Sequence, residues 1–201
     1  MNYTLIAISI SLILLAISYA ISQSYITVVY ERPKEVDVGI CDTITTNVAV
    51  YWSRTLNRRA SEDFLRQNIE VAEEYNKGFR VLGYEIVAMS SYTLSGMGYV
   101  EVNVVYNMSW GQHNSRCYFY VRVVNLTTIF DPVTGLGYYN ITIECLTDRE
   151  RPLLITSPQE EVKVSYAISN LWIIIAPTSY SSIVLEDWRG IRVEFRVPRG
   201  G

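Results

Sequence analysis

The stretch "YVEVNVVYNMSW" at Tyr99–Trp110 decides the fold, because its side chains alternate between apolar and more polar ones with a period of two. This is the repeat of a β-strand with one buried face, since successive side chains point to opposite sides of a strand. The apolar set consists of Val100, Val102, Val104, Tyr106 and Met108. We therefore expect a strand that packs one face on a core.

Working outward, "RCYFYVRVVN" at 116–125 and "YYNITIECL" at 138–146 alternate in the same way. Turn-forming stretches such as "DPVTGLG" and "DRERP" separate the candidate strands from one another. Four shorter candidates complete the set, at 161–168, 171–176, 182–187 and 190–197. Roughly seven or more short strands with such breaks predict an antiparallel β-sheet or sandwich, which we place at 79–201.

The segment 42–78, in contrast, has the period of an amphipathic helix. Asp42 suits the N-cap of a first helix over 43–57, and Ser61, followed by two acids, suits the start of a second. Gly78 suits the end of that second helix. We expect these helices to pack on the sheet, which makes the fold class α+β.

The first charged side chain of the chain is Glu31. Because about 20 predominantly apolar residues suffice to cross a bilayer as a helix, we expect residues 1–29 to be a transmembrane anchor or a signal segment. The lipid bilayer would be contacted through residues 3–29. The charged, proline-bearing stretch that follows predicts a linker at 30–41.

Anchor and cleaved signal are distinguished by what surrounds Ala20. Ser18 and Ala20 resemble the small residues of a cleavage site, so secretion after cleavage near Ala20 is the alternative. Apolar residues continue past that point, and no Lys or Arg precedes the segment, which favours a retained anchor. Arg32 and Lys34 would favour a cytoplasmic body, but the cysteines and the acceptor asparagines described below favour a body outside the cytoplasm.

Composition argues against several kinds of chemistry. The formal net charge is -3 and no run of Lys or Arg occurs, so we expect no binding to nucleic acid. His113 is the single histidine, and the sequence places it in a turn, without zinc-type spacing around it. We find no nucleophile elbow and no phosphate-binding loop, so we expect no cofactor, no metal and no catalytic residue.

Two cysteines could form a disulfide. If 116–125 and 138–146 pair around Asp131 as a hairpin, Cys117 and Cys145 are opposite each other at a bridgeable spacing. The alternative is that both are free, buried thiols. Cys41 is left without an assigned partner, or replaces one of the two.

Three acceptor sequons for N-glycosylation are present, at Asn107, Asn125 and Asn140. Asn107 and Asn140 have the parity of the polar strand face, whereas Asn125 has the apolar parity at a strand end. Such short patterns also arise by chance, and they matter only for an exported body.

Tyrosine is abundant, with 16 residues. Tyr118 and Tyr120 share a strand face with Arg116 and Arg122, a combination that suits a partner-binding or sugar-stacking surface. The alternative is that this face is buried between the two sheets of a sandwich.

An apolar N-terminal helix, amphipathic helix and β-rich body form a layout similar to that of type IV pilin-like proteins. The similarity is architectural, since the glycine-containing processing site and the glutamate of such helices are not found here. We expect a membrane-anchored extracytoplasmic structural or interaction protein, in the specific form of a pilin-like surface-appendage subunit, with protein partners or self-association. The alternatives are an exported glycan- or protein-binding β module and a tethered hydrolase.

Overall fold

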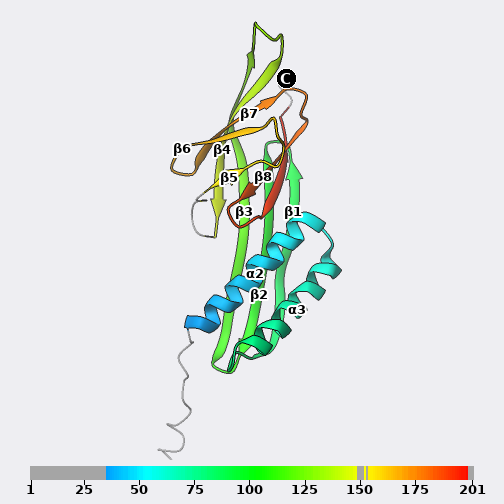
Figure 1. The fold of residues 1–201 in the computed structure, drawn as a ribbon, viewed down its shortest axis with the longest axis vertical. Coiled ribbons are helices and arrows are strands. Elements are labelled where there is room, and N and C mark those ends of the chain that lie inside the picture. Colours follow the sequence, from blue (N-terminus) through cyan, green and yellow to red (C-terminus); the bar gives the residue numbers. More distant parts are fainter. Residues whose placement is uncertain (1–34, 149–151, 153, 199–201) are drawn as a thin grey trace, which may run out of the picture. The chain divides into compact units, whose positions relative to one another are not determined.

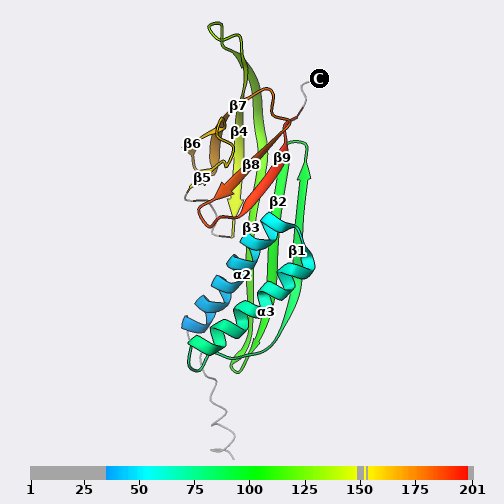
Figure 2. The ribbon, with the colours of Figure 1, turned by 45° about the vertical axis from the view of Figure 1, so that its right-hand side comes forward.

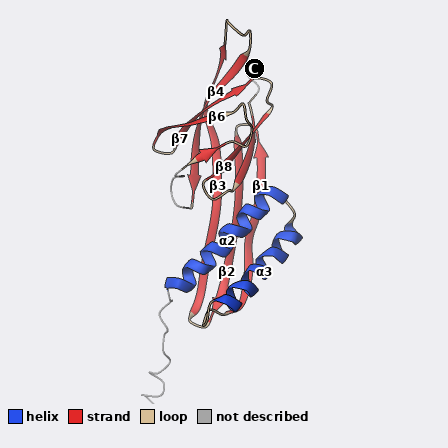
Figure 3. Cartoon of the chain, viewed as in Figure 1, coloured by secondary structure: helices blue, strands red, loops and turns tan. Residues whose placement is uncertain are grey.

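The computed structural model describes residues 35–148, 152 and 154–198 (Figure 1). The expected anchor or signal segment lies outside the described residues. Neither of the two described helices carries an apolar stretch long enough to span a membrane. The described residues form two helices, a large antiparallel sheet and a small one, which confirms the α+β class (Figure 3).

The helices start earlier than the sequence predicts. Helix α2 spans Glu35–Thr55, so the expected linker is wrong over residues 35–41. Asp42 lies inside α2, well after its start, and therefore does not cap it. Its carboxylate instead binds side chains of the sheet. Helix α3 spans Arg58–Tyr75 and is capped by Asn57, whose Oδ1 accepts a hydrogen bond from the Ala60 N–H at 3.1 Å.

Six strands form the large sheet, in the order β1-β2-β3-β4-β7-β6. All neighbouring strands are antiparallel, as the alternation predicts. Their bounds are Val81–Leu94 for β1, Met97–Met108 for β2, Gly111–Phe130 for β3, Gly137–Thr147 for β4, Lys163–Ile168 for β6 and Leu171–Pro177 for β7. The small sheet has the order β5-β8-β9, with bounds Ile155–Thr156, Ser182–Asp187 and Arg192–Arg196.

One face of the large sheet holds the core. Helix α2 packs on β2 and β3, α3 packs on α2 and β1, and β9 crosses the same strands further along (Figures 1 and 2). The buried side chains of the central strands are those that the alternation assigns to the inner face, for example Val102, Phe119 and Ile143. The helices and the small sheet thus cover one face of the large sheet between them.

The strand register overturns the predicted disulfide. Val121, not Cys117, is opposite Cys145, and Cys117 lies four residues away from that position along β3. The hairpin turns at Asp131–Leu136, where the Asp131 N–H donates to the Leu136 C=O at 2.9 Å, which is later than the sequence suggests. Cys41, Cys117 and Cys145 are all free and buried, so the alternative of small buried thiols is the correct one.

Candidate functional site

The outer face of the large sheet carries a cluster of tyrosines that we call the tyrosine face, made of Tyr92, Tyr99, Tyr118 and Tyr120. Tyr99 is central, with its ring centroid 5.0 Å from that of Tyr92, 6.5 Å from that of Tyr118 and 6.3 Å from that of Tyr120. Three neighbouring strands, β1, β2 and β3, supply these rings: Tyr92 and Tyr120 are opposite Tyr99, and Tyr118 is opposite Glu101 on the same face. The sequence alone groups only Tyr118 and Tyr120, because Tyr92 and Tyr99 lie on other strands and come close to them only through strand pairing.

Ion pairs neutralise the charges on this face. The Arg116 guanidinium lies 4.9 Å from the centroid of Tyr118, and its Nε is 2.6 Å from Oε1 of Glu101. Arg122 Nη2 is 2.6 Å from Oε2 of Glu144. Burial, with a hydrogen bond to Glu101, raises the pKa of Tyr99 to about 12, so this hydroxyl stays a donor at physiological pH.

No second sheet covers the tyrosine face in the described part of the chain. The small sheet lies on the opposite side, because a side chain on the inner-face residue Gly98 would point at the β9 backbone. Tyr118 and Tyr120 are half-buried, and Arg116 and Arg122 are exposed. The interpretation of this face as the inside of a sandwich is therefore wrong.

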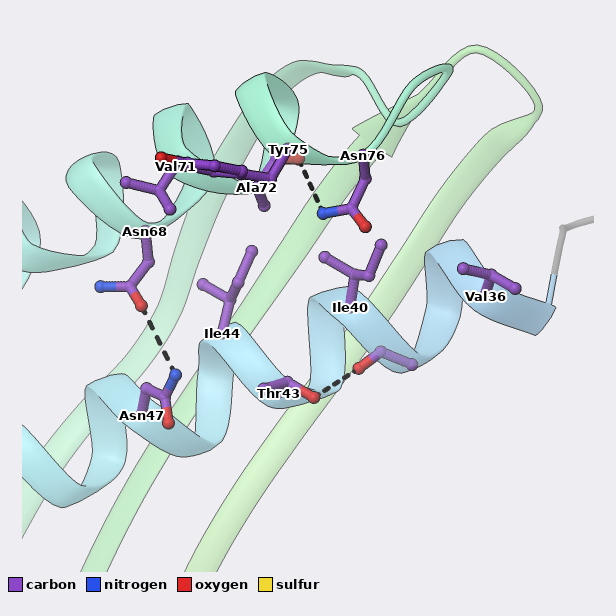
Figure 4. Close-up of a pocket in the computed structure, with 11 residues that line it drawn as sticks. Val36, Ile40, Thr43, Ile44, Asn47, Asn68, Val71, Ala72, Tyr75 and Asn76 are labelled. Atoms are coloured by element: carbon purple, nitrogen blue, oxygen red, sulfur yellow. Dashed lines mark hydrogen bonds between the residues drawn. The ribbon is translucent and has the colours of Figure 1, made fainter.

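A second uncovered surface is the apolar groove between α2 and α3, which we call the helix groove (Figure 4). It has a volume of about 450 Å³, and none of the described residues that line it is charged. Val36, Val71 and Tyr75 are 69%, 53% and 76% exposed there, although all are large and largely apolar. Asn47 and Asn68 face each other across it, with Nδ2 of Asn47 3.5 Å from Oδ1 of Asn68.

Sequence reasoning missed the helix groove because three of its eleven described lining residues fall in the predicted linker. Val36, Ile40 and Ile44 recur every four residues, which is a helical signal. Pro33 and the neighbouring charges outweighed that signal in the prediction. Once α2 extends back to Glu35, the stripe faces α3.

The residues most like a catalytic set meet where α2 crosses β3. Nε2 of His113 is 3.0 Å from Oδ1 of Asp42, and the Ser115 hydroxyl donates to the same oxygen at 2.7 Å. In a hydrolytic triad the histidine lies between serine and aspartate and accepts the serine proton. Here serine and histidine share one carboxylate oxygen, so Ser115 has no base, and the group ties α2 to β3.

His113 itself corrects a prediction. It lies within β3, paired with Tyr106, and its side chain is 18% exposed, whereas the sequence places it in a turn. Among the described residues, no group of histidine, cysteine and carboxylate side chains has the arrangement of a metal site.

The three acceptor asparagines all lie in strands. Asn107 in β2 is half-buried, and its Oδ1 accepts a hydrogen bond from Nε2 of Gln112 at 2.9 Å. Asn140 in β4 is also half-buried. Asn125 is exposed, because the register shifts between Val123 and Asn125 in β3. Glycosylation stays a prediction, and Asn125 has the most accessible side chain of the three.

The buried thiols give a direct test of the cysteine assignment. Burial raises the pKa of Cys41 and of Cys117 to about 12, and raises that of Cys145 as well. At pH 8 only about one thiol in 10⁴ is ionised at such a pKa, and thiolate is the reactive form. We expect the native protein to resist iodoacetamide at pH 8, and the protein unfolded in guanidinium without reductant to take up three labels, as measured by mass spectrometry. Fewer than three labels after unfolding would contradict the assignment of three free thiols.

The described residues thus form an α+β body that leaves an aromatic surface and an apolar groove uncovered. No family model, curated protein or solved structure matches the chain.

Proposed function

We propose that the chain is a membrane-anchored extracytoplasmic protein that acts through protein–protein contacts, including contacts between its own copies. The observation that carries this proposal is the helix groove, a concave apolar surface left open by the described residues. Large exposed apolar surfaces in soluble bodies mark interaction sites. A pilin-like subunit of a surface appendage is the specific form of this proposal, since such assembly needs apolar helix surfaces for neighbouring subunits.

The apolar segment supports the membrane part of the proposal. Residues 3–29 contain no charge, and the first described helix begins at Glu35, only a few residues later. A stretch of this length and character is suited to the hydrocarbon core of a bilayer.

Membrane anchoring is tested by fractionation. We expect the full chain to stay in the membrane pellet after alkaline carbonate extraction, and a variant that lacks residues 1–29 to be released. Protease added to intact cells should digest the body of the anchored chain. A full chain that is extracted by carbonate without loss of its N-terminus, or that is protected until cells are lysed, would contradict the proposal.

A second candidate function rests on the tyrosine face. Stacked tyrosines next to arginines suit the faces of sugar rings, which would make the body an exported glycan-binding module. Tyr118→Ala should then weaken binding of cello- or chito-oligosaccharides by roughly fivefold in isothermal titration calorimetry, because an aromatic stacking contact contributes about 1 kcal/mol. Tyr166→Ala is the matched control, since Tyr166 is 55% exposed on β6 and lies outside the tyrosine face. The absence of any binding by the wild-type protein would rule out this candidate for these sugars.

A further inference from the structure

The hairpin of β3 and β4 ends in an exposed apolar tip. We call Ile129, Phe130, Val133 and Leu136 the hairpin tip, and they are 47%, 65%, 91% and 55% exposed. In Figure 1 this end of the hairpin extends past the other strands of the large sheet. A convex surface with four large apolar side chains in water calls for an explanation, because scattered single apolar residues are common but clusters are not.

The hairpin tip is held in one shape by Asp131. Its Oδ1 accepts a hydrogen bond from the Val133 N–H at 2.9 Å, and its Oδ2 accepts one from the Thr134 hydroxyl at 2.7 Å. These bonds lower the pKa of Asp131, and its carbonyl accepts a further bond from the Gly135 N–H at 2.9 Å. The turn is therefore pre-organised, which lowers the entropy lost when it binds a partner.

The helix groove is the concave counterpart of the hairpin tip. Its lining between Val36 and Asn76 contains no charged residue in the described part of the chain, and a Cβ added at Gly39 would meet nothing within 4 Å, so the floor beside α2 is open. The start of α2 lies at the β2–β3 turn, where Trp110 Nε1 donates to Oδ2 of Asp37 at 3.3 Å. The hairpin tip lies at the opposite end of β3, which is 20 residues long. One chain thus carries a convex and a concave apolar surface that cannot meet within one copy.

We propose that the hairpin tip of one copy binds in the helix groove of a second copy. Such an interface is heterologous, because each copy uses two different surfaces, and it produces an open chain of subunits if the rotation between copies does not close a ring. The proposal deepens the proposed function by naming the contact through which copies associate, but it does not depend on the membrane anchor.

Charge supports a second copy as the occupant. Asp131 is the one charged residue in the stretch 124–140, and its carboxylate is already satisfied within the turn. The described lining of the groove, which carries no charge, therefore receives the tip without an unpaired charge being buried. A lipid surface is a less suitable occupant for two reasons. The stretch 124–140 contains no Lys or Arg that could bind anionic headgroups, and lipid binding by the tip would leave the groove unexplained.

The test uses two variants of the full chain in a mild detergent, followed by sedimentation velocity. Val133→Asp spoils the tip and leaves the groove intact, and Val71→Asp spoils the groove and leaves the tip intact. We expect the wild type to form a concentration-dependent series of oligomers. Each variant alone should associate at least roughly tenfold more weakly than the wild type, since a charge would be buried without a partner.

Mixing the two variants gives the decisive result. The intact tip of Val71→Asp fits the intact groove of Val133→Asp, so an equimolar mixture should form one-to-one dimers that do not grow. Ile168→Asp is the matched control, because Ile168 is 67% exposed but lies on β6, outside both surfaces, and it should associate like the wild type.

Three outcomes would overturn the proposal. The first is a wild type that shows no association beyond that of the variants, and the second is a mixture that stays as weakly associated as each variant. The third is a Val133→Asp change that leaves association of the full chain normal but abolishes the binding of the variant lacking residues 1–29 to phosphatidylcholine vesicles, which would assign the tip to lipid. Carbonate extraction of the same variants separates this contact from the proposed function, since both should stay in the membrane if anchoring is correct.

Discussion

Replacing Arg189 with methionine is expected to lower the free energy of unfolding by about 3–5 kcal/mol, the cost of leaving a buried ion pair without one partner. The Arg189 side chain is 6% exposed and that of Asp187 is 0% exposed. Arg189 Nε donates to Oδ2 of Asp187 at 2.8 Å, and its Nη2 donates to the Tyr118 carbonyl at 3.0 Å. Arg189 also pairs with Asp148 at the end of β4. One side chain thus joins the β8–β9 turn to the large sheet.

The pH dependence of this variant follows from Asp187. Burial raises the pKa of Asp187, while Arg189 and backbone N–H groups oppose the rise. Without Arg189 the folded-state pKa should rise further above the unfolded value. A raised carboxyl pKa favours the folded state only at low pH, where the group is protonated, and this contribution is lost as pH rises through the folded-state pKa. The deficit of Arg189→Met should therefore shrink as pH falls toward about 4.

Urea unfolding followed by tryptophan fluorescence measures both effects. Arg58→Met is the matched control, since the Arg58 side chain is 64% exposed and pairs with Glu62 on the helix surface, where such pairs contribute about 0.5 kcal/mol or less. An Arg189→Met variant as stable as this control at pH 7 would show that the buried pair contributes nothing.

Replacing Gly98 with alanine is expected to lower the free energy of unfolding by about 1–3 kcal/mol, the usual cost of overpacking. A Cβ at Gly98 would lie 2.4 Å from the Glu194 carbonyl oxygen and 2.4 Å from Cγ1 of Val193. The backbone of β9 would have to move away from β2, and the core beneath β9 would lose contacts.

The control for this glycine is Gly83→Ala in β1. A Cβ there would meet Nδ2 of Asn107 at 3.7 Å, which is an ordinary contact. The substitution should therefore change the free energy of unfolding by no more than about 0.5 kcal/mol, as surface substitutions usually do. Equal midpoints of urea unfolding for the two variants would contradict the close approach of β9 to Gly98.

The alternation of apolar and polar residues predicts the strands well wherever the register is regular. The segments at 99–110, 138–146, 171–176 and 182–187 differ from β2, β4, β7 and β8 by only a few residues at their ends. Strand β1 escapes the same analysis, because register shifts near Gly83 and Ala88 change the parity of its side chains. A bulge is defined by the partner strand, so a single segment does not reveal it.

The candidate surfaces show the same division. Tyr118 and Arg116 could be placed on one strand face from their spacing alone, and the structure leaves that face uncovered. The disulfide prediction failed because it needed the register of two strands, and the turn at Asp131–Leu136 sets that register. The helix groove was missed because it needs two helices side by side.

The sequence by itself determined the type and order of most of the elements, with β1 and β5 as the exceptions, since helical and strand periods are set by residues near one another in the chain. Only the tertiary structure decided which faces stay open, which side chains share Asp42 and which residues lie opposite Cys145. These features depend on contacts between residues distant in sequence, such as Asp42 with His113, and on the free energy of packing whole elements together. No short window of the chain contains that information.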